Sequence, residues 1–110
     1  MPDDAARAAL LDVQIDAGPV TTIALAGDLD PATAPVLEEA IATAVADDSV
    51  SRVLLDLGGL TFLDSSGLRV FVTAREHLTV RNAELVLRNP TDNVRRLLDI
   101  TGLGEVIAIE

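Results

Sequence analysis

The chain has 110 residues, a length typical of one domain with a single hydrophobic core. Eighteen acidic residues against eight basic ones give a formal net charge of −10, which disfavours binding to nucleic acid or to an anionic membrane surface. The basic residues are all arginines, and the absence of lysine excludes P-loop and Schiff-base chemistry in their usual forms. Cysteine is also absent, which excludes disulfides and thiolate metal sites.

Residues 1–9 lack the basic and then apolar layout of a signal peptide, and we expect them to form a loose N-terminal arm. Residues 10–110 are expected to be one domain. No run in the chain approaches the roughly 20 apolar residues that span a bilayer. The sequence therefore predicts a soluble cytoplasmic protein, in agreement with the absence of cysteine.

The first structured segments are predicted to be two strands. Residues 11–16 alternate apolar and polar side chains, the pattern of a strand with one face in water. Residues 17–19 (AGP) are typical of a turn, and residues 20–26 are rich in β-branched and apolar side chains. These runs predict an antiparallel hairpin whose second strand ends at Gly27.

A helix is predicted to follow this hairpin. Asp30 is a favourable N-cap, and Pro31 suits the first helical position, which needs no intrahelical donor. Apolar residues then recur in pairs every four positions and give the helix one apolar face. These residues are Val36, Leu37, Ala40, Ile41, Ala44 and Val45. The helix is expected to end near Asp47 and Asp48, whose charges oppose the helix dipole.

The rest of the chain predicts two strand–helix units and a last strand. Residues 53–57 (VLLDL) are typical of a central strand with both faces covered, and apolar spacing predicts a helix from Ser65 to near Thr79. The next strand covers residues 83–87, and the following helix begins at Thr91 and ends at Gly102. Residues 105–109 form the last strand.

This order of elements, ββαβαβαβ, predicts a single α/β domain. Alternating strands and helices call for a mixed, mainly parallel sheet of about five strands with helices packed on it. Only the N-terminal hairpin is expected to be antiparallel.

A hydrolase that uses Ser65 would lack a base. If Ser65 and His77, the only histidine, lie in one helix, their separation of twelve positions at about 1.5 Å each places them ~18 Å apart, too far for a hydrogen bond. The surrounding stretch also lacks the first glycine of a G-x-S-x-G nucleophile motif. The expected position of His77 is the polar side of a helix.

Four carboxylates could meet at one edge of the sheet: Asp28, Asp30, Asp56 and Asp64. Their spacing lacks the dense acidic run of an EF-hand loop. We expect no metal, with Asp30 as a helix cap and the other carboxylates solvated.

The stretch from Leu60 to Leu68, LTFLDSSGL, lies where the central strand is predicted to turn into a helix. Asp64 or Ser65 can cap the first free amides of that helix, and Gly67 relieves crowding. A hydroxyl here is also well placed for phosphorylation, because a phosphate would meet unpaired amides and the positive end of the helix dipole. Both interpretations stay open at this point.

Three local motifs follow one another along the chain. The first is GDLD at residues 27–30, and the second is LDL at 55–57 followed by FLDSSGL at 62–68. The third is VRRLL at 94–98 with TGL at 101–103. Together with the element order, they resemble the STAS domain family of bacterial anti-sigma factor antagonists over roughly residues 9–109, with D-S-S-G-L as the family's phosphorylation motif.

The resemblance implies a partner-switching regulator and not an enzyme. In such systems the unmodified antagonist binds an anti-sigma factor that is itself a serine kinase, and this frees the sigma factor. The kinase uses its own ATP and Mg²⁺ to phosphorylate the antagonist, which dissociates, and a serine phosphatase resets it. The chain would then need no cofactor or metal, would bind neither nucleic acid nor membrane, and would be a monomer or a weak dimer.

Ser65 matches the position that is phosphorylated in the family. The partner-binding residues implied around it are Asp28, Asp30, Asp64, Ser66, Gly67 and Arg69. Arg69 departs from the family, in which glycine often follows the motif's leucine. It could pair with the added phosphate or with Asp64, or change which kinase binds. The alternative within the family is a STAS interaction module of a stress-signalling assembly or an accessory subunit of a lipid transporter.

Overall fold

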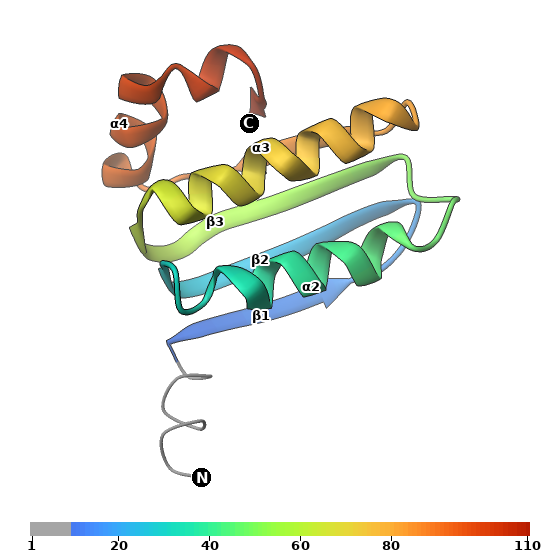
Figure 1. Cartoon of the computed structure of the whole chain (residues 1–110), viewed down its shortest axis with the longest axis horizontal. Helices are drawn as coiled ribbons and strands as arrows, with labels where there is room; N and C mark the ends of the chain where they lie inside the picture. The colour runs from blue at the N-terminus through green and yellow to red at the C-terminus, as the bar shows by residue number, and fades with distance from the viewer. Residues whose placement is uncertain (1–9) are drawn as a thin grey trace, which may run out of the picture.

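In the computed structural model, which describes residues 10–110, the elements follow one another in the predicted order ββαβαβαβ (Figure 1). They are β1 (Leu11–Asp16), β2 (Val20–Leu29), α2 (Ala34–Val45), β3 (Arg52–Leu63), α3 (Ser65–Val80), β4 (Glu84–Arg88), α4 (Asp92–Thr101), the 3-10 helix η1 (Leu103–Glu105) and β5 (Ala108–Ile109). The predicted loose arm, residues 1–9, lies outside the described residues. Among residues 10–110, no helix is long and apolar enough to cross a bilayer.

The five strands form one sheet in the order β1-β2-β3-β4-β5. β1 pairs with β2 in antiparallel orientation, and every other neighbouring pair is parallel. The predicted mixed, mainly parallel sheet and the central position of β3 are thereby confirmed.

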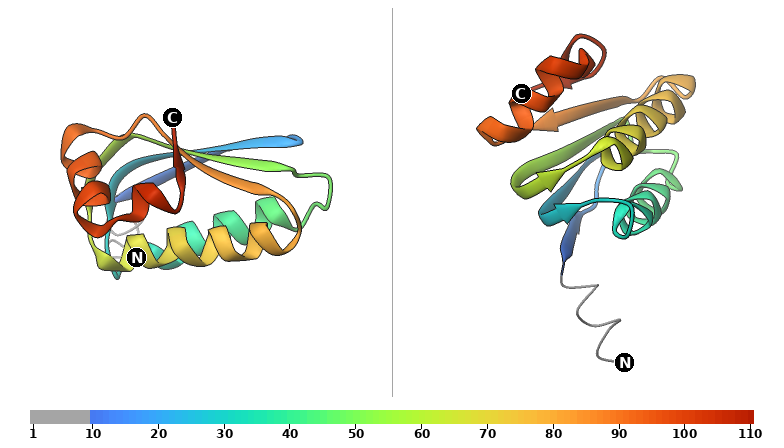
Figure 2. Two further views of the ribbon diagram at one scale, coloured as in Figure 1. Left: turned by 90° about the horizontal axis from the view of Figure 1, so that it is seen from above. Right: turned by 60° about the vertical axis from the view of Figure 1, so that its left-hand side comes forward.

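Helices α2 and α3 lie side by side on one face of the sheet (Figure 2). Leu37 of α2, Phe71 of α3 and Leu55 of β3 are fully buried in the core that these layers enclose. Neither helix lies on the opposite face, but residues 53, 54, 55 and 57 of β3 are all buried, so the prediction of a central strand covered on both faces is confirmed. Leu54 points to that face, because side chains alternate along a strand, and is still only 7% exposed.

β2 and β3 are longer than predicted because glycines let their backbones approach closely. Gly27 does not end β2. Its φ of 108° is a backbone conformation that glycine adopts readily and other residues rarely do, and a Cβ there would lie 2.1 Å from the carbonyl oxygen of Leu10. In β3, a Cβ on Gly59 would lie 2.9 Å from the Cβ of Ala26, and the β2–β3 register shifts at this point. The two strands therefore stay paired as far as Leu29 and Leu63.

α2 begins at Ala34 and not at Pro31, so the prediction that Asp30 is its N-cap is wrong. The Asp30 carboxylate instead accepts hydrogen bonds from the amides of Ala32 (3.0 Å) and Thr33 (3.1 Å) and closes a turn before the helix. The buried Thr33 hydroxyl donates to the carbonyl oxygen of Asp28 at 2.8 Å. This turn fixes the path between β2 and α2.

The C-terminal unit follows the prediction except in its last strand. Thr91 caps α4 by accepting from the amide of Val94 (3.4 Å), and Gly102 ends it with a φ of 75°. Residues 103–105 then form a 3-10 turn, so the last strand contains only Ala108 and Ile109 and not residues 105–109.

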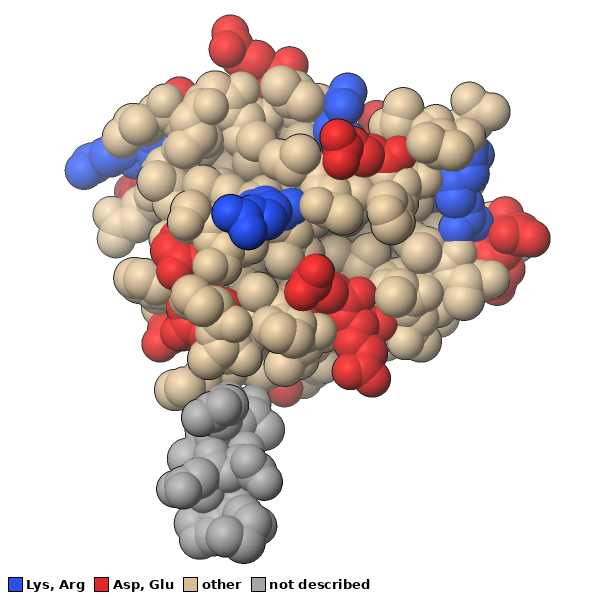
Figure 3. Space-filling view, in the orientation of Figure 1, with Lys and Arg blue, Asp and Glu red and all other residues tan. Residues whose placement is uncertain are grey.

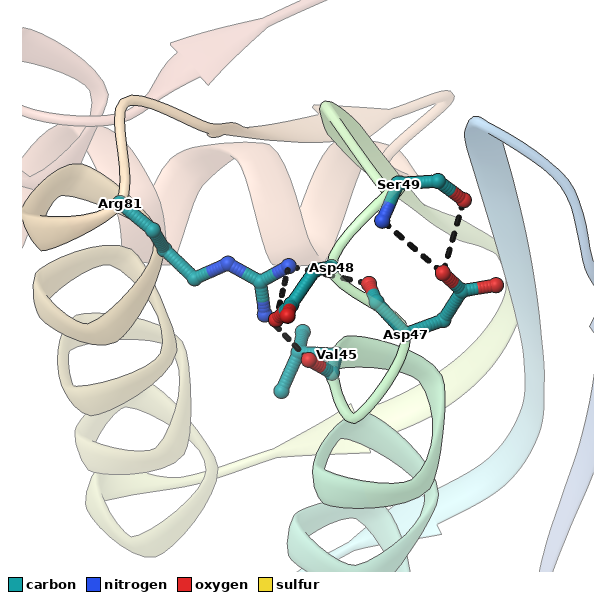
Figure 4. A network of polar contacts seen from close by, with 5 residues as sticks. All are labelled: Val45, Asp47, Asp48, Ser49 and Arg81. Atoms are coloured by element: carbon teal, nitrogen blue, oxygen red, sulfur yellow. Dashed lines mark hydrogen bonds and ion pairs between the residues drawn. The ribbon is translucent and has the colours of Figure 1, made fainter.

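Arg81 ties together the C-terminal ends of α2 and α3 (Figure 4). Its guanidinium donates to the carbonyl oxygens of Val45 and Asp47 and lies 3.9 Å from the carboxylate of Asp48. Hydrogen bonds from the backbone and side chain of Ser49, and then the charge of Arg81, lower the pKa of Asp47. The positive charge of Arg81 thus lies at the C-terminal end of α2, beside Asp47 and Asp48, whose negative charges interact unfavourably with the helix dipole.

Candidate functional site

Ser65 is the first residue of α3 and is exposed. It lies at the end of the molecule where β2 and β3 finish and α2 and α3 begin (Figure 1). The N-cap is Asp64, whose carboxylate accepts from the amide of Ser66 at 2.9 Å. Among the hydrogen bonds between described residues, none uses the Ser65 hydroxyl, so the capping function belongs to Asp64 and leaves the serine free.

Asp28 lies in β2, one strand away from the segment that carries Ser65. It pairs with Phe62 of β3, and its carboxylate accepts a hydrogen bond from the Thr61 hydroxyl at 3.1 Å. The same hydroxyl is 3.1 Å from the carbonyl oxygen of Gly27. Thr61 therefore orients the Asp28 carboxylate at the end of the sheet, a role that the sequence did not suggest.

Gly67 lies inside the molecule. It is buried, and a Cβ at this position would lie 2.5 Å from the side chain of Leu63 and 2.6 Å from that of Leu29. The absence of a side chain lets the first turn of α3 pack against the ends of β2 and β3. Gly67 therefore positions Ser65 and Ser66.

Ser66 and Arg69 border a hollow of about 270 Å³ between the N-terminal ends of α2 and α3. Pro31, Ala34 and Glu38 line its other side. Arg69 is exposed, and the ion pairs found within residues 10–110 do not join it to Asp64. Its guanidinium is available to a group outside the folded chain.

Two residues considered in the sequence lie away from this end. Asp56 is in the middle of β3, where its carboxylate accepts from the amide of Gly58 at 2.9 Å. His77 is in the last turn of α3, in the same helix as Ser65, and this confirms the ~18 Å separation. Within the described part of the chain, no three acidic or histidine side chains converge on one point where a metal could bind.

The helix-bearing face carries charges of both signs. Figure 3 shows acidic and basic side chains scattered among uncharged ones on this face, without a continuous acidic surface. On this face, therefore, the excess of acidic residues in the chain does not form a single acidic patch.

Comparisons with known proteins converge on one family. Residues 13–108 match the family described as "Mlab, STAS domain". The chain is 42% identical over 89 residues to the anti-sigma-B factor antagonist of Listeria monocytogenes, a match that covers 80% of this chain and 76% of that protein.

Solved structures agree with the sequence match. An anti-sigma factor antagonist from Mycobacterium paratuberculosis superimposes with a TM-score of 0.75 at 32% identity, covering 90% of this chain and 84% of the other. SpoIIAA in its unphosphorylated form gives a TM-score of 0.76 at 24% identity, with 91% and 87% covered, and so supports the fold.

Proposed function

The chain belongs to the STAS domain family, and we propose that it is an anti-sigma factor antagonist that is switched off by phosphorylation of Ser65. In its unmodified form it binds an anti-sigma factor that is also a serine kinase, and the sigma factor is released. The proposal is supported mainly by one observation: the Ser65 hydroxyl is exposed at the start of α3 while Asp64 does the capping.

The physical effect of a phosphate at Ser65 supports a switch. It would add about −1.5 to −2 charges beside the Asp64 carboxylate, and this charge would have to be desolvated in a closely packed interface. A net penalty of about 3 kcal/mol would weaken binding roughly 150-fold. Such a change releases a partner without unfolding the domain.

The chemistry of the transfer belongs to the partner. In the proposal, the kinase supplies ATP and Mg²⁺. The Ser65 oxygen attacks the γ-phosphorus as ADP leaves, and the hydroxyl proton passes to a base in the kinase active site. A serine phosphatase hydrolyses the phosphoserine and restores the binding form. The chain itself contributes the substrate hydroxyl, needs no cofactor, works in the cytoplasm where sigma factors act, and is a monomer or a weak dimer.

The test uses purified anti-sigma factor kinases encoded in the same genome as this chain. Each is incubated with ATP and Mg²⁺ and with wild type, Ser65→Ala or Ser65→Asp, and binding is measured by calorimetry. We expect Ser65→Ala to bind like unmodified wild type but to take up no phosphate. Ser65→Asp should bind at least about tenfold more weakly, because one negative charge reproduces part of the phosphate's effect.

Three results would contradict the proposal. Phosphate mapped by mass spectrometry to Ser66 or Thr61 would move the modification site. Equal affinities for all three proteins would remove the switch. Isolation of the chain in a stable complex with a permease or a transport ATPase, and with none of the kinases, would instead support the accessory-subunit alternative.

A further inference from the structure

Phe62 is an exposed aromatic residue beside the proposed phosphorylation site. The chain has two phenylalanines, of which Phe71 is fully buried in the core whereas Phe62 is 49% exposed. Phe62 lies near the end of β3, three residues before Ser65. A single exposed apolar side chain is common on protein surfaces, so the significance of Phe62 depends on the groups that surround it.

Further exposed apolar side chains lie at the same end of the molecule. The amide of Asp28 donates to the carbonyl oxygen of Leu10 at 2.6 Å, and Asp28 pairs with Phe62, so these three residues are neighbours across adjacent segments. Leu10 is 44% exposed. Val36, in the first turn of α2, is 43% exposed and lies at this end as well (Figure 1).

Carboxylates are interspersed with these apolar groups. Thr61 holds the carboxylate of Asp28 beside Phe62, and Asp64 caps α3 two residues further on. An apolar contact bordered by fixed negative charges fits a partner surface with an apolar pocket and basic side chains around it. The net charge of −10 likewise favours a partner with a basic surface.

We propose that Phe62, with Leu10 on the far side of Asp28 as a second apolar contact, is the apolar anchor by which this chain docks on its anti-sigma factor, into an apolar pocket with a basic rim. This inference rests on the proposed function, because it names the groups that hold the same partner. It also explains how the switch acts: a phosphate on Ser65 would lie three residues from the anchor and would bring charge to the edge of an apolar contact.

The first experiment measures the affinity of Phe62 variants for the kinase that binds wild type. We expect Phe62→Ala to weaken binding about 30-fold, as truncation of a buried anchor does, and Phe62→Leu to weaken it less than about fivefold. Val80→Ala is the matched control, since Val80 is 86% exposed at the other end of α3, ~22 Å along the helix axis. It should bind like wild type, and circular dichroism should show all three variants folded.

The second experiment identifies what contacts Phe62. Phe62→p-benzoylphenylalanine is irradiated with the same kinase, in parallel with the same replacement at Val80. We expect a cross-link to the kinase from position 62 and none from position 80. Prior phosphorylation of Ser65 should abolish the cross-link.

The outcomes separate this inference from the proposed function. Equal binding by wild type and Phe62→Ala, or a cross-link only to a second copy of this chain, would overturn the anchor while the Ser65 switch stands. If none of the kinases binds wild type, the proposed function fails and the anchor fails with it.

Discussion

Gly67 controls how closely the first turn of α3 approaches the sheet. We predict that Gly67→Ala lowers the free energy of unfolding by about 1–2 kcal/mol, because the new methyl group would overlap Leu29 and Leu63 and alanine's helix propensity offsets only part of that strain. Urea denaturation measures the change. Gly18→Ala is the control, since its nearest neighbour would be at an ordinary 3.4 Å, and a loss as large as that of Gly67→Ala would contradict the assignment.

Asp30 has a structural role that can be separated from its charge. Replacing it with alanine removes the acceptor for the amides of Ala32 and Thr33 and should cost about 1 kcal/mol of stability. Asp30→Asn keeps an acceptor and should retain most of that stability, as measured by thermal unfolding. If Asp30→Asn nevertheless binds the anti-sigma factor more weakly than wild type, its carboxylate also contributes to docking; equal destabilisation by both variants would argue against the hydrogen-bonding role.

The pair of helices α2 and α3 depends on contacts at both of its ends. At the N-terminal end, Gly67 permits close packing. At the C-terminal end, the guanidinium of Arg81 donates hydrogen bonds to the carbonyl groups of Val45 and Asp47. Ser65 is carried by α3, so the position of this helix sets the position of the proposed site. The far end of the helices therefore matters to the site through packing.

We predict that Arg81→Met lowers the free energy of unfolding by about 1–2 kcal/mol, because two carbonyl groups at the end of α2 lose a charged donor. Arg75→Met is the control, because Arg75 is also half-buried on α3 and has no ion pair with another residue of the 10–110 region. Differential scanning calorimetry compares the two. Similar melting temperatures for both variants would show that the bridge contributes little.

For the molecule as a whole, the net charge of −10 governs encounter with a basic partner. We predict that the association rate constant with the anti-sigma factor falls about tenfold between about 50 mM and about 500 mM salt, because screening shortens the range of attraction. The dissociation rate constant should change by less than about threefold, since the proposed apolar anchor would be insensitive to salt. Stopped-flow or surface-binding kinetics measure both constants, and an association rate that does not depend on salt would contradict long-range steering.

Local sequence patterns determined the class of fold and predicted where in the chain the candidate site lies. The alternation in residues 11–16, the apolar face of α2 and the caps at Thr91 and Gly102 depend on neighbours a few residues away, so the sequence shows them directly. The stretch LTFLDSSGL likewise predicted a strand-to-helix turn with a serine at its start. The element order and the parallel sheet then followed from the alternation of strands and helices.

Only the tertiary structure decided how far β2 and β3 extend, which residue caps α3, and which side chains at that end are exposed. The extension of the strands depends on contacts such as that between Gly59 and Ala26, which are far apart in the sequence. In the sequence Phe62 is one apolar residue of the stretch that follows the predicted central strand, and its 49% exposure is a property of the folded chain. Burial and close approach depend on segments that meet through folding, and for that reason no local pattern reports them.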